Sequence, residues 1–421
     1  MHRRPVLASV PFPLLPAVPA LLAACDASSG PAATIAIDSA GVEVVTSDPL
    51  NSDATCSLGA EPIFRVGDDE NDEAHWFSSI RGVGRLSDGS VVVVDRTSAE
   101  IRIFDETGRH LRSMGRPGEG PGEFSNPWKL WILPGDTLWV GDYRPWRYQV
   151  FTASGEWVRA ARLDPVYPNP TRQGGVLDNG ISINTTESWS TRRADFSTPD
   201  TLVVELHDAG GQMMGTLAYL PTSPVGRTQA SEAVNLVLRP TFSPRAFADA
   251  RGGTIALAVG RDTEVRLLDD GFRLRRIVRW SDPDRDVTGA DVQAWRDDYI
   301  ERRGGRNSPE WDESDDAIID PQIPVADNFP AMSGIRIGRD GRLWVLPYQR
   351  PRADEVRWMA FEPDGAFLCH LENQHTGLTT YEFSQDYWLG VHSDELGIQT
   401  AVMYRLHTPV PGDAPAGSES P

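Results

Sequence analysis

Short apolar stretches alternate with glycine-containing turns along most of the chain, and this pattern predicts β-strands. The stretch from Val91 to Val94 is apolar and β-branched, and the turn Asp88-Gly89 precedes it. After a second apolar stretch, Ile101 to Phe104, the turn Thr107-Gly108 follows. Glycine reaches the positive φ angles of tight turns at little cost, so strands bounded by such turns indicate hairpins. We therefore expect an all-β fold.

The pattern recurs at a spacing of about 47 residues, which indicates an internal repeat. Phe77 corresponds to Phe124, and Asp95 corresponds to Asp142, without a gap between the two pairs. The turn pairs of the five complete units are Asp88-Gly89 with Thr107-Gly108, Gly135-Asp136 with Ser154-Gly155, Asn179-Gly180 with Gly210-Gly211, Gly252-Gly253 with Asp270-Gly271, and Asp340-Gly341 with Asp364-Gly365. Such four-stranded units are typical of the blades of a β-propeller.

A sixth unit near the end of the chain has only three strands of its own. They are Leu378 to Phe383, Tyr387 to Val391 and Ile398 to Leu406. The stretch Ile63 to Gly67 resembles a fourth strand that lacks the first three. Pairing this N-terminal strand with the last blade would close the ring and remove the exposed sheet edges. We therefore predict a six-bladed β-propeller over residues 41–407.

Residues 281–330 do not repeat and form a predicted insertion, mostly helical and irregular. Thr288 is a candidate helix cap, Val292, Trp295 and Tyr299 fall on one helical face, and Gly304-Gly305 would end the helix. The insertion is interpreted either as a peripheral helix packed on the ring or as a lid or partner surface near its mouth. Residues 408–421 are rich in Pro, Gly, Ala and Ser, which predicts a disordered tail.

The N-terminus reads as a targeting segment. Arg3 and Arg4 precede an apolar stretch that ends in Leu22-Ala23-Ala24-Cys25. This ending resembles the lipobox of bacterial lipoproteins, which implies a signal peptide over residues 1–25, a lipid on Cys25 and a flexible tether over residues 26–40. An ordinary signal peptide with a coincidental cysteine is the alternative. Both interpretations imply that the protein is exported. The first also implies that only a lipid anchors it to the membrane, in the periplasm or at the outer membrane.

Charge and composition exclude several classes of function. Acidic residues outnumber basic ones 60 to 40, giving a net charge of -20, and no segregated basic face is evident, which argues against nucleic-acid binding. Lys129 is the single lysine, which removes most Schiff-base and P-loop chemistry. The eight histidines are dispersed, and no Gly-x-Ser-x-Gly elbow is present. The sequence therefore contains no recognisable catalytic set, and no metal site is assigned.

Two cysteines remain after Cys25, namely Cys56 and Cys369. An oxidising compartment would allow them to form a disulfide. The alternative is two unpaired, buried thiols, because the sequence does not place the two residues within bonding distance.

Three segments resemble six-bladed β-propeller proteins related to NHL repeats, many of which are uncharacterised bacterial lipoproteins. They are Gly115 to Phe124 before a new blade, the run Asp340 to Val345, and the ending from Trp388 to Leu406. The resemblance implies the fold over roughly residues 40 to 407. It does not imply a function, because propellers host lyases, lactonases, sugar binders and scaffolds.

The candidate site residues lie at the predicted mouth of the ring. Asp95 and Asp142 occupy equivalent positions after a second strand, where they are candidate calcium ligands or, as we favour, braces for the following loop. Arg144 and Trp146 follow Asp142, and the blade entrances carry Trp76 and Trp128. Aromatic and arginine side chains together favour stacking on a sugar or a peptide, although tryptophans in a propeller are more often wedges between blades.

The leading hypothesis is a non-enzymatic, lipid-anchored module that binds or scaffolds a protein, peptide or glycan of the bacterial envelope, with no expected cofactor. The alternative is a calcium-dependent lactonase or esterase resembling the gluconolactonase propellers, in which Asp95 and Asp142 would be ligands. A zinc-dependent lyase is disfavoured because the histidines are scattered. The ligand, the partner and the membrane leaflet stay open.

Overall fold

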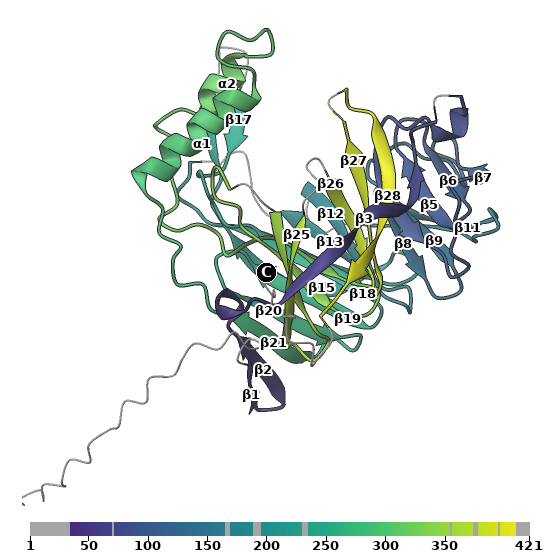
Figure 1. Cartoon of the computed structure of the whole chain (residues 1–421), viewed down its shortest axis with the longest axis horizontal. Helices are drawn as coiled ribbons and strands as arrows, with labels where there is room; N and C mark the ends of the chain where they lie inside the picture. The colour runs from purple at the N-terminus through teal and green to yellow at the C-terminus, as the bar shows by residue number, and fades with distance from the viewer. Residues whose placement is uncertain are drawn as a thin grey trace, which may run out of the picture.

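The computed structural model describes residues 34–69, 71–164, 169–187, 195–229, 235–353, 356–373, 378–394 and 396–409. The predicted signal peptide, Cys25 and residues 410–421 of the predicted tail lie outside these residues. Within them, the chain forms six four-stranded antiparallel blades (Figure 1). Among the described residues, no helix has the length and apolar character that crossing a membrane requires.

Five blades are continuous in sequence, and each runs from an inner to an outer strand. Blade 1 contains β4 (Ile80–Arg85), β5 (Val91–Asp95), β6 (Glu100–Phe104) and β7 (His110–Met114). Blade 2 contains β8 (Pro127–Leu133), β9 (Thr137–Asp142), β10 (Arg147–Phe151) and β11 (Trp157–Arg162). Blade 3 contains β12 (Asn169–Val176), β13 (Ser182–Glu187), β14 (Asp200–His207) and β15 (Met213–Thr222).

The next two blades follow the same order. Blade 4 contains β18 (Ala246–Arg251), β19 (Thr254–Val259), β20 (Glu264–Asp269) and β21 (Leu274–Trp280). Blade 5 contains β22 (Met332–Ile337), β23 (Leu343–Pro347), β24 (Val356–Phe361) and β25 (Phe367–Asn373). A further hairpin, β16 (Gly226–Gln229) and β17 (Asn235–Leu238), lies between blades 3 and 4 in the sequence and was not predicted.

Blade 6 is closed by the N-terminal strand, as predicted. It contains β26 (Leu378–Phe383), β27 (Tyr387–Ser393) and β28 (Gln399–His407), and β3 (Thr55–Val66) is its outer strand. β3 pairs antiparallel with β28, with Val66 opposite Ala401 and Phe64 opposite Met403. The pairing joins the two ends of the propeller, so no blade is left with an unpaired closing edge.

A separate hydrophobic core lies between each pair of neighbouring blades. Val91 and Val93 belong to the core shared with blade 6, whereas Val92 and Val94 belong to the core shared with blade 2. Successive side chains of a strand point to opposite faces, so a strand packed on both faces is apolar at every position. All four valines are 0% exposed. This double burial explains why the second strand of blade 1 is a continuous apolar run.

The inner strands approach each other closely at the centre of the ring. A Cβ at Gly175 of β12 would lie 2.5 Å from the backbone nitrogen of Ala250 in β18. These two strands pair in parallel at this one point, Gly175 with Ala250. Only glycine fits such a contact, which explains its position in an inner strand.

The predicted insertion contains two helices, α1 (Gly289–Arg302) and α2 (Glu313–Ile318). Thr288 caps α1 as predicted, in a capping box with Asp291. The helices are tied to each other by Tyr299, whose hydroxyl donates to the Asp315 carboxylate at 2.7 Å. Figure 1 shows both helices on the same side of the molecule as β17.

The flexible tether was predicted over residues 26–40, but its last residues, from Thr34 onward, belong to a β-hairpin. β1 (Thr34–Ser39) pairs with β2 (Val42–Ser47), and β2 runs parallel to β21 at the outer edge of blade 4. Ala40 and Gly41 both have positive φ angles, which suits the two-residue turn between these strands. The alternating β-branched residues around this turn were the overlooked signal.

Candidate functional site

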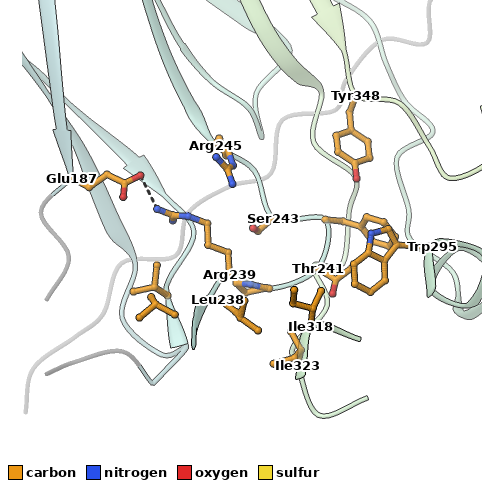
Figure 2. Close-up of a pocket in the computed structure, with 14 residues that line it drawn as sticks. Glu187, Leu238, Arg239, Thr241, Ser243, Arg245, Trp295, Ile318, Ile323 and Tyr348 are labelled. Atoms are coloured by element: carbon orange, nitrogen blue, oxygen red, sulfur yellow. Dashed lines mark hydrogen bonds and ion pairs between the residues drawn. The ribbon is translucent and has the colours of Figure 1, made fainter. Parts of the chain in front are cut away.

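A pocket of about 460 Å³ opens where the insertion meets the connection between blades 3 and 4. We call it the mouth pocket. Its polar and aromatic lining comes from four distant segments: Glu187 ends β13, Trp295 lies on α1, Tyr348 follows β23, and the residues before β18 are Arg239, Thr241, Ser243 and Arg245. Figure 2 shows Glu187 and Arg239 on one side of the pocket and Trp295 and Tyr348 on the other. This size is typical of sites for small ligands.

Aromatic rings pack together behind one wall of the mouth pocket. The ring of Phe242 lies 4.8 Å from Phe329, 6.2 Å from Trp295 and 6.2 Å from Tyr348, measured between centroids. Tyr348 stacks on Phe329 at 5.7 Å. Because these rings support one another, the half-buried faces of Trp295 and Tyr348 form a rigid apolar surface.

Several polar groups in the mouth pocket have no partner in the described part of the chain. They are the hydroxyls of Thr241, Ser243 and Tyr348 and the indole Nε1–H of Trp295. Burial raises the pKa of Tyr348, so its hydroxyl stays protonated and can donate at neutral pH. The pocket thus offers neutral donors and acceptors beside an aromatic surface.

Arg239 supports the opposite wall of the mouth pocket. Its guanidinium pairs with Glu187 at 2.9 Å and Asp200 at 3.4 Å, and it donates to the carbonyl of Ser223 at 2.8 Å. The Arg239 side chain is largely buried, so these contacts fix its position. Arg239 therefore joins the connection before β18 to blade 3.

Asp95 and Asp142 are braces, which is the interpretation that the sequence favoured. Both carboxylates are buried. Asp95 accepts backbone N–H groups of Ser79 at 2.9 Å and Ser98 at 3.1 Å. Asp142 accepts from the backbone of Asn126 at 2.7 Å and pairs with Arg147 at 3.0 Å. The oxygens of the two carboxylates are thus occupied by contacts around their own blades.

Three of the four other candidate residues lie around Tyr143 in blade 2: its ring is 6.2 Å from Trp128 and 5.8 Å from Trp146, and Arg144 follows it in the chain. Trp146 is buried in the core between blades 2 and 3, so the structure makes it a wedge instead of a ligand contact. Arg144 is exposed, and Trp76 is 57% exposed in blade 1. Trp128, in β8, lies with its ring 4.9 Å from the guanidinium carbon of Arg81.

In the inner strands of blades 1, 2, 4, 5 and 6, basic residues outnumber acidic ones. Blades 1, 2, 4 and 5 contribute the basic residues Arg81, Arg85, Lys129, Arg251 and Arg336, whereas the acidic residues Asp249 and Glu382 come from blades 4 and 6. This ratio reverses that of the whole chain, in which acids predominate. The sequence signal was one or two basic residues in the inner strands of blades 1, 2, 4 and 5.

The carboxylate of Glu382 contacts residues from several blades, near the C-terminal ends of the inner strands. Its carboxylate pairs with Arg251 of blade 4 at 2.9 Å and with Arg339 of blade 5 at 3.6 Å. It also accepts the hydroxyl of Tyr387 at 2.7 Å and the backbone N–H of Arg85 in blade 1 at 3.4 Å. One buried carboxylate thus connects four of the six blades.

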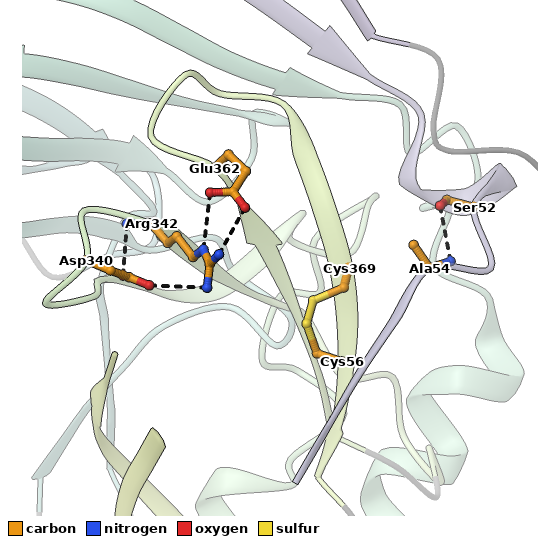
Figure 3. Close-up of a disulfide and its surroundings, with 7 residues drawn as sticks. All are labelled: Ser52, Ala54, Cys56, Asp340, Arg342, Glu362 and Cys369. Carbon is orange, nitrogen blue, oxygen red and sulfur yellow. Dashed lines mark hydrogen bonds and ion pairs between the residues drawn. A yellow bond between two sulfur atoms is a disulfide. The ribbon is translucent and has the colours of Figure 1, made fainter. Parts of the chain in front are cut away.

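Cys56 and Cys369 form a disulfide, which resolves the alternative left open by the sequence (Figure 3). Their Cα atoms are 5.6 Å apart. Cys56 lies in the first part of β3, which pairs in parallel with β25, the outer strand of blade 5. The disulfide therefore attaches the ring-closing strand to the neighbouring blade.

His207 lies buried in blade 3, and acidification is expected to destabilise the protein through it. Burial lowers the pKa of His207 below its ordinary 6.5, whereas the unfolded chain keeps that value. The unfolded state therefore binds the proton first, and stability is lost as the pH falls below about 6.5, with a slope of at most about 1.4 kcal/mol per pH unit. Urea midpoints between pH 8 and pH 5 should fall less in a His207→Gln variant, and an equal fall in both proteins would contradict this assignment.

In the described ranges, no three His, Cys, Asp or Glu side chains gather closely enough to hold a metal ion.

Comparison with known proteins supports the fold. A family model described as a 6-bladed beta-propeller matches residues 75–138. No curated protein matches the chain. The match covers blade 1 and the start of blade 2.

Three solved structures illustrate the structural similarity. A member of the DUF4221 family from Bacteroides vulgatus is 9% identical with a TM-score of 0.48, covering 85% of this chain and 99% of its own. A candidate exported protein of Bacteroides fragilis is 10% identical with a TM-score of 0.47, covering 84% and 96%. The calcium-binding protein regucalcin from Agrobacterium tumefaciens is 12% identical with a TM-score of 0.38, covering 84% and 96%.

These identities and TM-scores are too low to assign a ligand or an activity. The blade topology, the closing strand and the matching family model agree with one another. The chain is a six-bladed β-propeller that is closed by its N-terminal strand.

Proposed function

We propose that this propeller is an exported, lipid-anchored binding module of the bacterial envelope, and that it holds its ligand in the mouth pocket. The mouth pocket carries this proposal. The N-terminal segment ending in Cys25 supports export and anchoring. The Cys56–Cys369 disulfide supports export as well, because disulfides persist in oxidising compartments.

The lining favours a glycan among the three ligand classes. A cavity of about 460 Å³ has room for a sugar unit or a short peptide segment, whereas a protein partner needs a broad contact surface. Trp295 and Tyr348 present aromatic faces, and the neutral hydroxyls of Thr241 and Ser243 stand beside them. Apolar sugar faces stack on aromatic rings, and sugar hydroxyls exchange hydrogen bonds with such groups.

The insertion becomes part of the site in this proposal. Trp295 of α1 and Ile318 of α2 both line the mouth pocket. Of the two interpretations drawn from the sequence, a wall or lid at the mouth therefore fits better than a purely peripheral helix.

Replacing Trp295 by Ala is expected to weaken glycan binding by roughly tenfold or more, because an aromatic anchor in a pocket supplies a large part of the binding energy. The measurement is a glycan-array screen of the mature domain, followed by calorimetric titration of the best oligosaccharide. Tyr348→Phe, which removes only the hydroxyl, should give a smaller loss.

Trp76→Ala is the matched control, because Trp76 is an exposed tryptophan of blade 1 that does not line the mouth pocket. It should bind like the wild type. Loss of binding in Trp76→Ala but not in Trp295→Ala would overturn the assignment of the site. If only peptides bind, and if their binding also depends on Trp295, the ligand is a peptide and not a glycan.

A further inference from the structure

Two arginines at the centre of the ring, Arg81 and Arg336, have no acidic partner in the described part of the chain. The guanidinium of Arg81 faces the ring of Trp128, and its Nε is buried without a hydrogen bond. Arg336 donates one hydrogen bond, at 3.3 Å, to the carbonyl of the adjacent Ile335. Both side chains are half-buried. Charged groups in such positions normally have a counter-charge.

Tyr381 lies on the inner strand of blade 6, between the blades of these two arginines. Its hydroxyl donates to the carbonyl of Ile80, next to Arg81, at 2.9 Å. Burial raises the pKa of Tyr381, and the positive charges of Arg81 and Arg336 oppose that rise. Arg81 and Arg336 lie on the inner strands of blades 1 and 5, which flank blade 6, the blade of Tyr381.

The nearby acids of the inner strands are engaged elsewhere. Asp249 accepts the backbone N–H of Ile337 at 2.8 Å, which joins blade 4 to blade 5. Glu382 is held by Arg251, Arg339 and Tyr387. Within the described ranges no acid balances these two half-buried cations, and an anion bound between them would supply the missing negative charge.

We infer that the centre of the ring binds a small carboxylate- or phosphate-bearing molecule between Arg81 and Arg336. The guanidinium groups match the geometry of both anions, and the face of Trp128 flanks the site. This site is separate from the mouth pocket, and it does not depend on the proposed glycan ligand.

The test is calorimetric titration of the mature domain with inorganic phosphate in one arm and citrate in the other, at constant ionic strength. At least one arm should give saturable one-to-one binding and raise the unfolding temperature. Arg336→Gln and Arg81→Gln should each weaken that binding by roughly tenfold or more, because hydrogen bonds to charged groups are lost. Phosphate binding alone would identify a phosphate ligand, and citrate binding alone a carboxylate.

Arg109→Gln is the matched control, because this arginine of blade 1 has a side chain that is 77% exposed. It should leave anion binding unchanged, as should the mouth-pocket variant Trp295→Ala. Arg81→Lys keeps the charge and should restore part of the affinity if Arg81→Gln folds poorly. No saturable binding in either arm, or an equal loss in Arg109→Gln, would overturn the inference.

Discussion

Removal of the Cys56–Cys369 disulfide is expected to lower the free energy of unfolding by about 3–5 kcal/mol. The two cysteines are 313 residues apart, so the bond constrains a very long loop of the unfolded chain. In the folded state it holds β3 against β25, where the backbone of His370 donates to Ala54 at 2.8 Å. Urea unfolding of a Cys56→Ser/Cys369→Ser variant beside the wild type measures the difference.

A reductant provides the control for this prediction. The wild type should become as unstable as the variant when reduced, and the variant should not respond to the reductant. Proteolysis should cut the variant first near β3, because a detached closing strand leaves β28 of blade 6 with an unpaired edge. If the variant unfolds at the same urea concentration as the wild type, the bond contributes nothing to ring closure.

The repeat was visible in the sequence because each second strand is buried on both faces. Val91 to Val94 is apolar at every position for that reason, and its equivalent in blade 2 follows the same rule. The closing strand was also predictable, because Ile63 to Gly67 lacks the other three strands of a blade. The observed β3 begins earlier, at Thr55, because its first part pairs with β25 of the neighbouring blade 5, a strand that lies far away in the sequence.

The mouth pocket was not predicted, because its lining comes from segments that are far apart in the chain. Trp295 and Tyr348 are about fifty residues apart, and Ser243 precedes a different blade. The sequence analysis instead selected residues at equivalent repeat positions, such as Asp95 and Asp142. Equivalent positions in a repeat usually serve the blade itself, and hydrogen bonds show this for both carboxylates.

The excess of basic residues on the inner strands was not predicted, for a related reason. A count of charges along the chain averages over all strand positions, whereas Arg81, Arg251 and Arg336 all belong to inner strands. Comparing inner strands with one another, position by position, would have revealed it. Charge in a propeller is therefore best counted by strand position within the blade.

Glu382→Ala is expected to lower the free energy of unfolding by about 3 kcal/mol. The side chain of Glu382 is 2% exposed, and the side chains of Arg251 and Arg339 are 21% and 27% exposed. Removing the carboxylate leaves two largely buried cations unpaired and takes an acceptor from the Tyr387 hydroxyl. Thermal and urea unfolding of the variant, compared with the wild type, measure the loss.

Glu264→Ala separates the effect of position from that of the ion pairs. Glu264 also contacts two arginines, Arg266 at 3.0 Å and Arg279 at 2.7 Å, but their side chains are 55% and 46% exposed. Exposed pairs contribute little, so this variant should lose less than about 1 kcal/mol. Equal losses of stability in the two variants would mean that the buried ion pairs of Glu382 contribute no more than exposed ion pairs do. A much larger loss in Glu382→Ala means that the four blades it contacts depend on one charge at the centre of the ring.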